Sequence, residues 1–371
     1  MNKKLKITYI IPTLDRGGAE RFFVDLIKNL DKETFEPSLI LYKKGGEWLK
    51  ELEALNIKVI ILEKKQRLDL RNFFEIKKAI EEIKPDIIHT QLGGDIYGVL
   101  AGRLAGVKKI MTTEVNTNND EGFFYNLVKR FSLRFVNKIV AVSQAVKEET
   151  KRRYALNYKK LEIVYNGIEL NRFKLAIRKF NDHERPDFVF GTIGRLSEQK
   201  GQRYLIRALA KSKNKKAKLF IAGEGELKSE FEAEIEALKL TKRVELVGRV
   251  VAPDFLARLD AFVLPSLWEG MGIVLVEAAL SGLPIIATRV GGVSEVVSDK
   301  EAWLINLETN DDKKLAEDKL VKALSLELDN LINNYNTVEV AAKIEKANKR
   351  VRENFDIKEI SRQYENLYQK I

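Results

Sequence analysis

Residues 260–288, reading DAFVLPSLWEGMGIVLVEAALSGLPIIAT, decide the fold. The short apolar runs at 260–264 and 284–288 predict two buried strands. Between them, the run IVLVEAAL at 273–280 has the length and residue types of a buried helix. A strand, a helix and a second strand at this spacing predict a right-handed βαβ unit of a parallel sheet.

The same alternation of short apolar runs and longer amphipathic stretches extends along the whole chain. Two such series, in a chain of 371 residues that is too long for one ordinary core, predict an α/β protein with two Rossmann-like doubly wound domains. We expect a first domain over 1–170, a second over 171–355, and a C-terminal helix over 356–371 that can return to the first domain. The remaining candidate strands are 5–11, 36–42, 57–62, 85–89, 108–112, 138–142, 161–165, 187–193, 217–222, 243–247 and 302–305.

Three stretches lie outside this alternation. The join between the domains is predicted near 166–186, where Asn166-Gly167 is a turn signal and residues 174–186 are polar and charged. Residues 306–318 predict a surface loop that enters a helix. The basic and then apolar segment 1–14 lacks a small-residue cleavage site, so we interpret it as the first strand and not as a signal peptide.

Composition excludes several kinds of site. The chain has no cysteine, which removes disulfides, thiolate catalysis and cysteine-based zinc sites, and it has only two histidines. No apolar run approaches the length that spans a bilayer. The net charge is +11, and most of the excess lies in residues 1–170. This predicts an anionic partner for the first half, a membrane surface more readily than nucleic acid, because no nucleic-acid-binding motif accompanies the charge.

Ligands of open parallel sheets bind outside the carboxyl ends of the strands, so the strand-to-helix junctions are the candidate sites. One junction reads GRLSEQKG over 194–201 and places Arg195 and Lys200 at the start of a helix. Two cations beside a helix N-terminus suit a diphosphate, although such residues at element ends are also commonly just solvated.

The junction after the strand at 260–264 carries two carboxylates. Glu269 lies in the loop beside Gly270 and Gly272, and Glu277 falls within the apolar helix, where we expect it to be largely buried. A buried carboxylate needs a partner, and the two vicinal hydroxyls of a ribose are suitable; the alternative is a structural bond to the backbone. A glycosidase acid and nucleophile pair is disfavoured, because these two residues are better placed to contact different parts of one extended ligand.

Further junctions contain glycines. Gly17-Gly18, Gly223 and the segment 289–295 each follow a candidate strand. Glycine lets the backbone approach a ligand closely, and it also makes tight turns, so both interpretations stand at this stage.

The ordered set of motifs resembles the family 4 group of retaining glycosyltransferases. The resemblance covers nearly the whole chain, and its most specific part is the pair Glu269 and Glu277, which matches the E-x7-E motif of that family. The other matching segments are GGAER at 17–21, PDIIH at 85–89, KIVAVSQAV at 138–146, VYNGIELNRF at 164–173, GRLSEQKG at 194–201, AGEGE at 222–226 and VGRV at 247–250.

The resemblance implies the GT-B architecture, in which two Rossmann-like domains face each other across a cleft. It also implies a nucleotide diphosphate sugar as donor substrate, UDP- or GDP-linked, with no other cofactor. The absence of a DxD motif agrees with a metal-independent enzyme. By this resemblance, Arg195 and Lys200 bind the diphosphate, and Glu277 binds the ribose. Glu269 takes a catalytic position beside the sugar. Backbone or base contacts come from Gly17, Gly18, Gly223, Val250, Gly270, Met271 and Gly272.

The resemblance further implies transfer of a hexose to a cell-surface glycan or glycolipid, by a cytoplasmic protein that is peripheral at the inner face of the membrane. One position departs from the family: Val115 stands where a T-x-H segment usually has histidine, leaving Glu114 or Asn116 as replacements. This departure keeps a second hypothesis open, a non-catalytic sugar-nucleotide-binding partner subunit. A sugar-nucleotide epimerase is a third, against which the E-x7-E match speaks.

A basic aromatic segment, GFFYNLVKRFSLRFVNK at 122–138, is the candidate acceptor side. A helix that combines aromatic residues with Lys129, Arg130 and Arg134 can lie on an anionic bilayer. The alternative is that its apolar face packs into the first domain and its charges are solvated.

Overall fold

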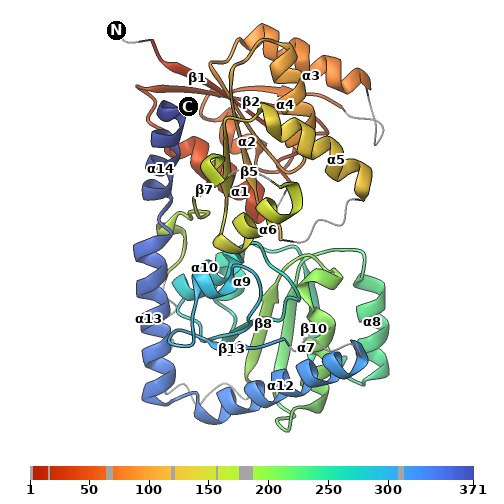
Figure 1. Ribbon diagram of the computed structural model, residues 1–371. Helices are drawn as coiled ribbons and strands as arrows, with labels where there is room; N and C mark the ends of the chain where they lie inside the picture. Colours follow the sequence, from red (N-terminus) through yellow and green to blue (C-terminus); the bar gives the residue numbers. More distant parts are fainter. Residues whose placement is uncertain are drawn as a thin grey trace. The chain divides into compact units, whose positions relative to one another are not determined.

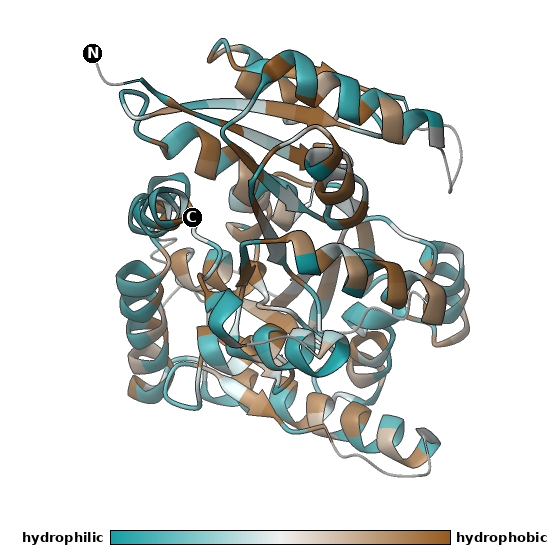
Figure 2. Cartoon of the chain, turned by 45° about the horizontal axis from the view of Figure 1, so that its top comes forward, coloured by the Kyte–Doolittle hydropathy of each residue, from teal (hydrophilic) through white to brown (hydrophobic). Residues whose placement is uncertain are grey.

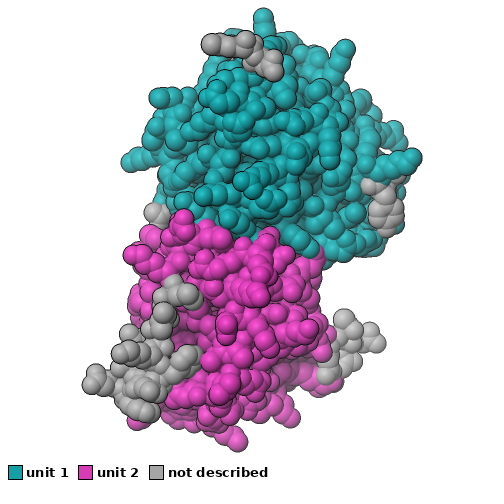
Figure 3. All heavy atoms as spheres, turned by 90° about the vertical axis from the view of Figure 1, so that its left-hand side faces the viewer, with its two compact units in different colours: residues 1–169, 355–371 teal, residues 170–354 magenta. Residues whose placement is uncertain are grey.

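The computed structural model of the chain describes residues 3–15, 17–63, 70–117, 122–155, 158–174, 187–307 and 313–371. They divide into two compact units, coloured separately in Figure 3. Unit 1 is Met1–Glu169 together with Phe355–Ile371, and unit 2 is Leu170–Asn354. In the described residues each unit is built on one sheet of parallel strands, which confirms the predicted α/β class with two Rossmann-like domains.

Unit 1 has a seven-stranded sheet in the order β3-β2-β1-β4-β5-β6-β7 (Figure 1). The order changes direction between β1 and β4, as in doubly wound folds. The strands are β1 (Leu5–Ile11), β2 (Phe35–Leu41), β3 (Lys58–Ile61), β4 (Ile87–Gln91), β5 (Lys109–Glu114), β6 (Lys138–Ala141) and β7 (Leu161–Ile163). The helices are α1 (Gly18–Asn29), α2 (Leu49–Glu53), α3 (Leu70–Ile83), α4 (Gly94–Leu104), α5 (Phe123–Ser132), α6 (Gln144–Tyr154) and α14 (Ile357–Lys370), with short 3-10 turns at Leu133–Phe135 and Tyr158–Lys160.

Unit 2 has a six-stranded sheet in the order β10-β9-β8-β11-β12-β13. Its strands are β8 (Val189–Ile193), β9 (Lys218–Ala222), β10 (Val244–Gly248), β11 (Ala261–Leu264), β12 (Ile285–Thr288) and β13 (Trp303–Ile305). Its helices are α7 (Gln202–Lys211), α8 (Lys228–Ala237), α9 (Ala252–Leu256), α10 (Ile273–Leu280), α11 (Val293–Val296), α12 (Lys313–Asn334) and α13 (Val338–Asn354), with 3-10 turns at Leu170–Arg172 and Glu198–Lys200.

Every strand lies at a predicted position, with ends that differ by a few residues. The segment 1–14 supplies β1, as its interpretation as a strand required. The chain passes from unit 1 to unit 2 between Glu169 and Leu170. Of the predicted linker and the predicted polar loop, residues 175–186 and 308–312 lie outside the described residues.

The two faces of the unit 1 sheet bury different helices. Tyr9 of β1 packs with α1 and α14, whereas the next residue, Ile10, packs with α3 and α4. This alternation follows from the strand period of two, which sends successive side chains to opposite faces. Figure 2 shows strands that are largely hydrophobic between helices banded in both colours, as this two-faced burial requires.

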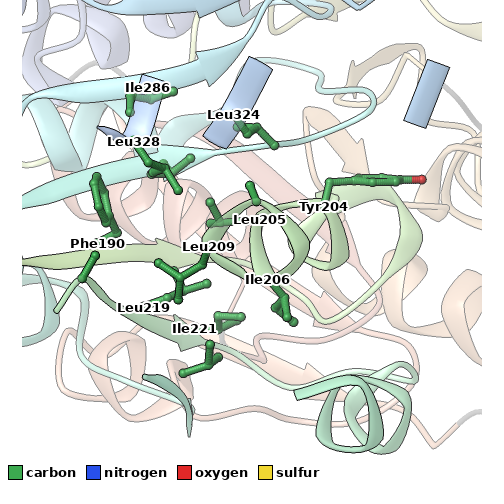
Figure 4. Close-up of a cluster of buried hydrophobic side chains, with 14 of the residues drawn as sticks. Phe190, Tyr204, Leu205, Ile206, Leu209, Leu219, Ile221, Ile286, Leu324 and Leu328 are labelled. Carbon is green, nitrogen blue, oxygen red and sulfur yellow. The ribbon is translucent and has the colours of Figure 1, made fainter. Parts of the chain in front are cut away.

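A large part of the core of unit 2 lies between its sheet and the helices α7 and α12. Figure 4 shows Phe190 of β8 and Leu219 of β9 facing Leu209 of α7, with Leu328 of α12 against them. All four side chains are fully buried. This packing holds β8 and β9 against the helices, and the loops of the candidate site follow the carboxyl ends of these strands.

Helix α14 is tied to unit 1 by buried polar contacts. His89 Nδ1 lies 2.8 Å from the Tyr368 hydroxyl and His89 Nε2 lies 2.8 Å from Thr113 Oγ1. The Tyr9 and Tyr368 hydroxyls are 3.0 Å apart, and the His89 ring stacks on Tyr364. Both ring nitrogens of His89 therefore have partners, and complete burial lowers its pKa to about 3. His89 is the central residue of β4, so the expected strand position is confirmed within the strand and not at its end, and its ring packs there in the neutral form.

We expect His89→Gln to make the free energy of unfolding depend less on pH below about 6.5. The folded state excludes a proton that the unfolded chain binds, so wild-type stability should fall as pH drops from about 6.5 towards about 3. The loss should reach about 1.4 kcal/mol per pH unit. Urea unfolding at a series of pH values measures it, and an unchanged slope in the variant would contradict a neutral buried His89.

Candidate functional site

The loop after β8 brings one predicted cation beside the loop after β11. Gly201 has a φ of +62°, and a Cβ there would lie 2.0 Å from the Pro265 carbonyl oxygen, so only glycine allows this approach. The Leu267 amide donates to the Gln199 carbonyl over 2.8 Å, and the Gln199 side-chain amide donates to the Trp268 carbonyl over 3.1 Å. The two predicted junctions thus form one bonded structure.

Glu269 is the buried centre of this structure. The carboxylate residue is 4% exposed, and its Oε1 accepts from Lys200 Nζ at 2.6 Å and from Ser266 Oγ at 2.7 Å. Ser266 is itself held through its carbonyl, which accepts from the Thr288 hydroxyl. A carboxylate in such a place must be paired, and the ammonium of Lys200 supplies the opposite charge.

Glycines bring three further loops close to this centre. Gly291 has a φ of +47°, and a Cβ there would lie 1.8 Å from the Glu269 carbonyl oxygen; the Gly292 amide donates to the same oxygen over 3.3 Å. Gly223, with a φ of +135°, lies directly against the Gly194 carbonyl. The Gly223 amide donates to the Gly248 carbonyl over 2.7 Å. The carboxyl ends of β8 to β12 therefore share one backbone framework.

The rim of this framework is charged and accessible. The Arg195 side chain is 75% exposed, with its Nε 3.3 Å from Glu226 Oε2. Arg249 pairs with Glu224 at 3.0 Å, and Val250 beside it is half-buried. The structure thus brings Lys200 and Glu269 into direct contact, and places Arg195, Gly223 and Val250 on neighbouring loops of the same edge.

Helix α10 begins at Ile273, directly after Gly272, whose φ of +81° suits glycine. Gly270, Met271 and Gly272 are all buried in the turn before it. Glu277 is partly buried, while Val274, Val276 and Ala278 of the same helix face the core. The reason is helical spacing, because Ile273 and Glu277 share the one face of α10 that the core does not cover.

In unit 1, Gly17 and Gly18 begin α1 at the carboxyl end of β1. A Cβ on Gly17 would lie 2.1 Å from Glu20 Oε2, whose burial raises the pKa of that carboxyl group. Arg21 turns inward, where it bonds Asp25 at 2.5 Å and Glu51 at 2.5 Å. The GGAER segment therefore forms a strand-to-helix turn whose arginine is paired with carboxylates of α1 and α2.

Helix α5 is inverted relative to an ordinary surface helix. Its aromatic and aliphatic residues point outward: Phe123 is 86% exposed, and Phe124, Leu127 and Phe131 are exposed as well. Its inward residues are Lys129 and Ser132. The predicted surface role of Lys129 is wrong, because this lysine is 3% exposed and bonds Asp95 at 2.5 Å and Glu114 at 2.8 Å. Arg130 and Arg134 are exposed, as expected.

Neither a membrane-spanning helix nor a cluster of metal ligands occurs in the described residues. Every helix in these parts of the chain is too short or too polar to span a bilayer. In the same ranges, no three histidine, aspartate or glutamate side chains gather as a metal site would require.

The fold and the strand-end framework together define the class. Two parallel α/β units in one chain are the architecture of GT-B glycosyltransferases. The structure is similar to that of Anabaena Alr3699/HepE, solved in complex with UDP-glucose, with a TM-score of 0.83 and 22% identity over 99% of this chain and 100% of that one. It is also similar to sucrose-phosphate synthase from Thermosynechococcus elongatus, with a TM-score of 0.80 and 17% identity over 99% of each chain.

The chain belongs to the family 4, group 1 glycosyltransferases. The model of Glycosyltransferase Family 4 matches residues 16–172, and that of Glycosyl transferases group 1 matches residues 173–351. Together they confirm the family to which the sequence motifs pointed.

Curated relatives extend along most of the chain. UDP-Gal:alpha-D-GlcNAc-diphosphoundecaprenol alpha-1,3-galactosyltransferase of Escherichia coli is 27% identical, over 92% of this chain and 96% of its own length. A relative from Campylobacter jejuni, N-acetylgalactosamine-N,N'-diacetylbacillosaminyl-diphospho-undecaprenol 4-alpha-N-acetylgalactosaminyltransferase, is 28% identical over 86% of this chain and 92% of its own length.

The sequence-based assignment missed three residues of this framework and one of unit 1. Gln199, Ser266 and Thr288 hold Glu269 and its loop, and Asp95 pairs with Lys129. A signal existed for Asp95, an acidic residue in the first turn of a helix that follows a strand, and for Ser266, a hydroxyl residue three positions before Glu269 in the same loop. The bonds of Gln199 and Thr288 depend on segments that are farther apart in the sequence.

Lys200→Met should destabilise unit 2, because it leaves the Glu269 carboxylate buried without its cation. We expect a loss of roughly 1–3 kcal/mol, less than for a fully buried pair because Lys200 keeps contact with water. Urea unfolding measures this loss, and Lys200→Met combined with Glu269→Gln should recover most of it.

The matched control is Lys218→Met. Lys218 pairs with Asp187 at 2.6 Å, with both side chains substantially exposed. Its removal should cost about 0.5 kcal/mol or less. Equal losses in Lys200→Met and the control would show that the Lys200–Glu269 pair is no more than a surface contact.

Proposed function

We propose that this glycosyltransferase moves a hexose, with retention of the anomeric configuration, from a UDP- or GDP-linked sugar to a glycan or lipid-linked acceptor. The observation that carries the proposal is the buried Glu269, which is bonded to Lys200 and surrounded by the strand-end loops of unit 2. This is the edge at which parallel sheets bind their ligands.

The donor diphosphate is assigned to Arg195 and Lys200. An exposed guanidinium can bind two phosphate oxygens at once, and an ammonium has three donors, so Lys200 can keep Glu269 while it binds phosphate. These two cations supply the positive charge that a leaving diphosphate needs, and we therefore propose transfer without a metal ion or other cofactor. Gly223 and Val250 lie on the loops assigned to the base.

The sugar and ribose are assigned to the two glutamates. Glu269 is held by Ser266 and Lys200 in one orientation, which suits a group that stabilises charge developing on the transferred sugar. Glu277 lies on the uncovered face of α10, where it can accept from ribose hydroxyls. Buried Gly270, Met271 and Gly272 contribute backbone contacts. Front-face attack, with the diphosphate accepting the proton of the acceptor, accounts for retention.

The acceptor is assigned to unit 1, where Gly17 and Gly18 lie at the start of α1. The names of both curated relatives specify acceptors linked through diphosphate to undecaprenol, and one specifies UDP-linked galactose as donor. These names support a lipid-linked acceptor for this chain.

We place the protein peripherally at an anionic membrane, on its cytoplasmic face. The outward aromatic face of α5 is unusual, because a helix normally turns such residues to the core. Residues 122–138 contain no acidic side chain, and Arg130 and Arg134 are exposed beside the aromatic face. An apolar face flanked by arginines matches the acyl boundary and the anionic headgroups of a bilayer.

Arg195→Ala and Glu269→Gln should each lower transfer by about 100-fold or more, because each removes charge stabilisation from the reacting groups. The donor for this assay is the UDP- or GDP-linked hexose that most raises the melting temperature of the protein. Arg152→Ala is the matched control, since Arg152 is 76% exposed and paired with a glutamate, as Arg195 is.

Full turnover in both variants would reject the assigned roles. Donor binding by the wild-type protein without any hydrolysis or transfer would favour the non-catalytic partner subunit, for which Val115 in place of histidine is the motivating observation.

Phe123→Ser together with Phe124→Ser should abolish flotation with vesicles of phosphatidylcholine and phosphatidylglycerol. Each inserted phenylalanine contributes roughly 1.5–3 kcal/mol, so the pair accounts for most of the binding. Val338→Ser, at an equally exposed apolar residue of unit 2, is the control and should float as the wild type does. Arg130→Gln with Arg134→Gln should weaken flotation at low salt. Wild-type protein that stays in solution would refute the membrane assignment.

A further inference from the structure

Helix α5 carries two opposite faces with different partners. The outer face is the aromatic surface of Phe123, Phe124, Leu127 and Phe131, all at least half exposed. The inner face ends in one buried cation, Lys129. Because both faces belong to one helix, a movement of α5 that inserts the outer face into an apolar medium also moves Lys129.

The Lys129 ammonium connects three elements of unit 1. It bonds Asp95 in the first turn of α4 at 2.5 Å and Glu114 at the end of β5 at 2.8 Å. It also lies 5.2 Å from the centre of the Tyr154 ring of α6. Burial alone lowers the pKa of Lys129, but the two carboxylates outweigh it and hold that pKa well above its usual range. The lysine is therefore charged at neutral pH.

Glu114 lies at the carboxyl edge of the unit 1 sheet. It is the last residue of β5, is 5% exposed, and its carbonyl accepts from the Val142 amide at the end of β6. It directly precedes Val115, the position at which the family resemblance expects an acceptor-side histidine. A shift of Glu114 would thus move the backbone where the acceptor is assigned.

The charges of Lys129, Asp95 and Glu114 do not balance, and this imbalance couples α5 to α4 and β5. One cation faces two buried carboxylates, so Lys129 cannot leave either without exposing an uncompensated buried charge. The link is consequently stiff compared with a solvated ion pair, whose partners separate at little cost.

We propose that Lys129 is a positioning residue that transmits the seating of α5 in an anionic bilayer to Glu114, so that membrane docking sets the geometry of the acceptor edge. The inference rests on the membrane docking of α5 under the proposed function, and on the proposed sugar transfer for its activity readout. It predicts that vesicles raise donor turnover, and that this stimulation requires the link from Lys129 to Glu114.

The sharpest variant is Glu114→Met. It removes the strand end of the link and leaves Lys129 with Asp95, a balanced pair, whereas Lys129→Met leaves two buried carboxylates and is prone to unfold. Glu162→Met is the matched control, because Glu162 is also a strand carboxylate paired with a lysine, Lys138, but it lies on β7, away from α5.

Hydrogen exchange with and without phosphatidylcholine and phosphatidylglycerol vesicles gives a readout that needs no substrate. Wild-type protein should gain protection in α5 and change its exchange over residues 109–117. Glu114→Met should keep the protection of α5 and lose the change over 109–117. Glu162→Met should behave as the wild type does.

Turnover of the selected nucleotide sugar gives the second readout. Vesicles should raise the turnover of the wild type and of Glu162→Met on the order of fivefold, which is the lower end of typical allosteric coupling. The turnover of Glu114→Met should be the same with and without vesicles. Equal responses of Glu114→Met and wild type in both readouts would overturn the inference, as would wild-type flotation without any exchange change at 109–117. Absence of turnover in all proteins, with the exchange pattern as expected, would reject the proposed function and support the coupling.

Discussion

Parallel strand pairing is the constraint on which both units depend. Every strand pair described in the two sheets is parallel, so each connection must cross back over the sheet before the next strand begins. This requirement produces the covering helices, and it also brings the carboxyl ends of all the strands of a sheet to one edge. In unit 2, five strand-end loops meet there, held by close glycine contacts such as Gly291 against Glu269. The site is therefore a consequence of the fold.

Buried charge is the second organising feature, and the buried charged groups named at the site edges each face a group of opposite charge. Glu269 is neutralised by Lys200 from a different loop, and Lys129 holds Asp95 and Glu114. Arg21 is matched to Asp25 and Glu51 in the same way. An unpaired charge in these places would cost several kcal/mol, so each pair constrains the loops that contribute to it. Charge pairing thus gives strand-end loops the rigidity that their backbone alone would lack.

Helix α5 shows how one pattern can be compatible with opposite structures. Its spacing of aromatic and basic residues predicts an amphipathic helix correctly, but periodicity alone does not say which face turns inward. In a surface helix the aromatic face normally turns inward. Here Lys129 occupies the inner face, because the buried carboxylates of Asp95 on α4 and Glu114 on β5 require a cation as their partner. A phenylalanine at this position would leave both carboxylates without one. The same arrangement leaves an apolar surface on the outside, and this surface is the reason to consider a membrane.

The sequence by itself determined the strands, the parallel type of the sheets and the family. Apolar runs, turn residues and the E-x7-E segment are local features, so they can be recognised without the tertiary structure. It also marked Arg195, Lys200, Glu269 and Glu277 by their positions after strands. Only the tertiary structure decided how these residues are partnered. The pairing of Lys200 with Glu269 and the burial of Lys129 between Asp95 and Glu114 both depend on contacts between segments far apart in the chain. Such contacts are set by packing and by the cost of unpaired charge, and neither is encoded in the spacing of residues along a single segment.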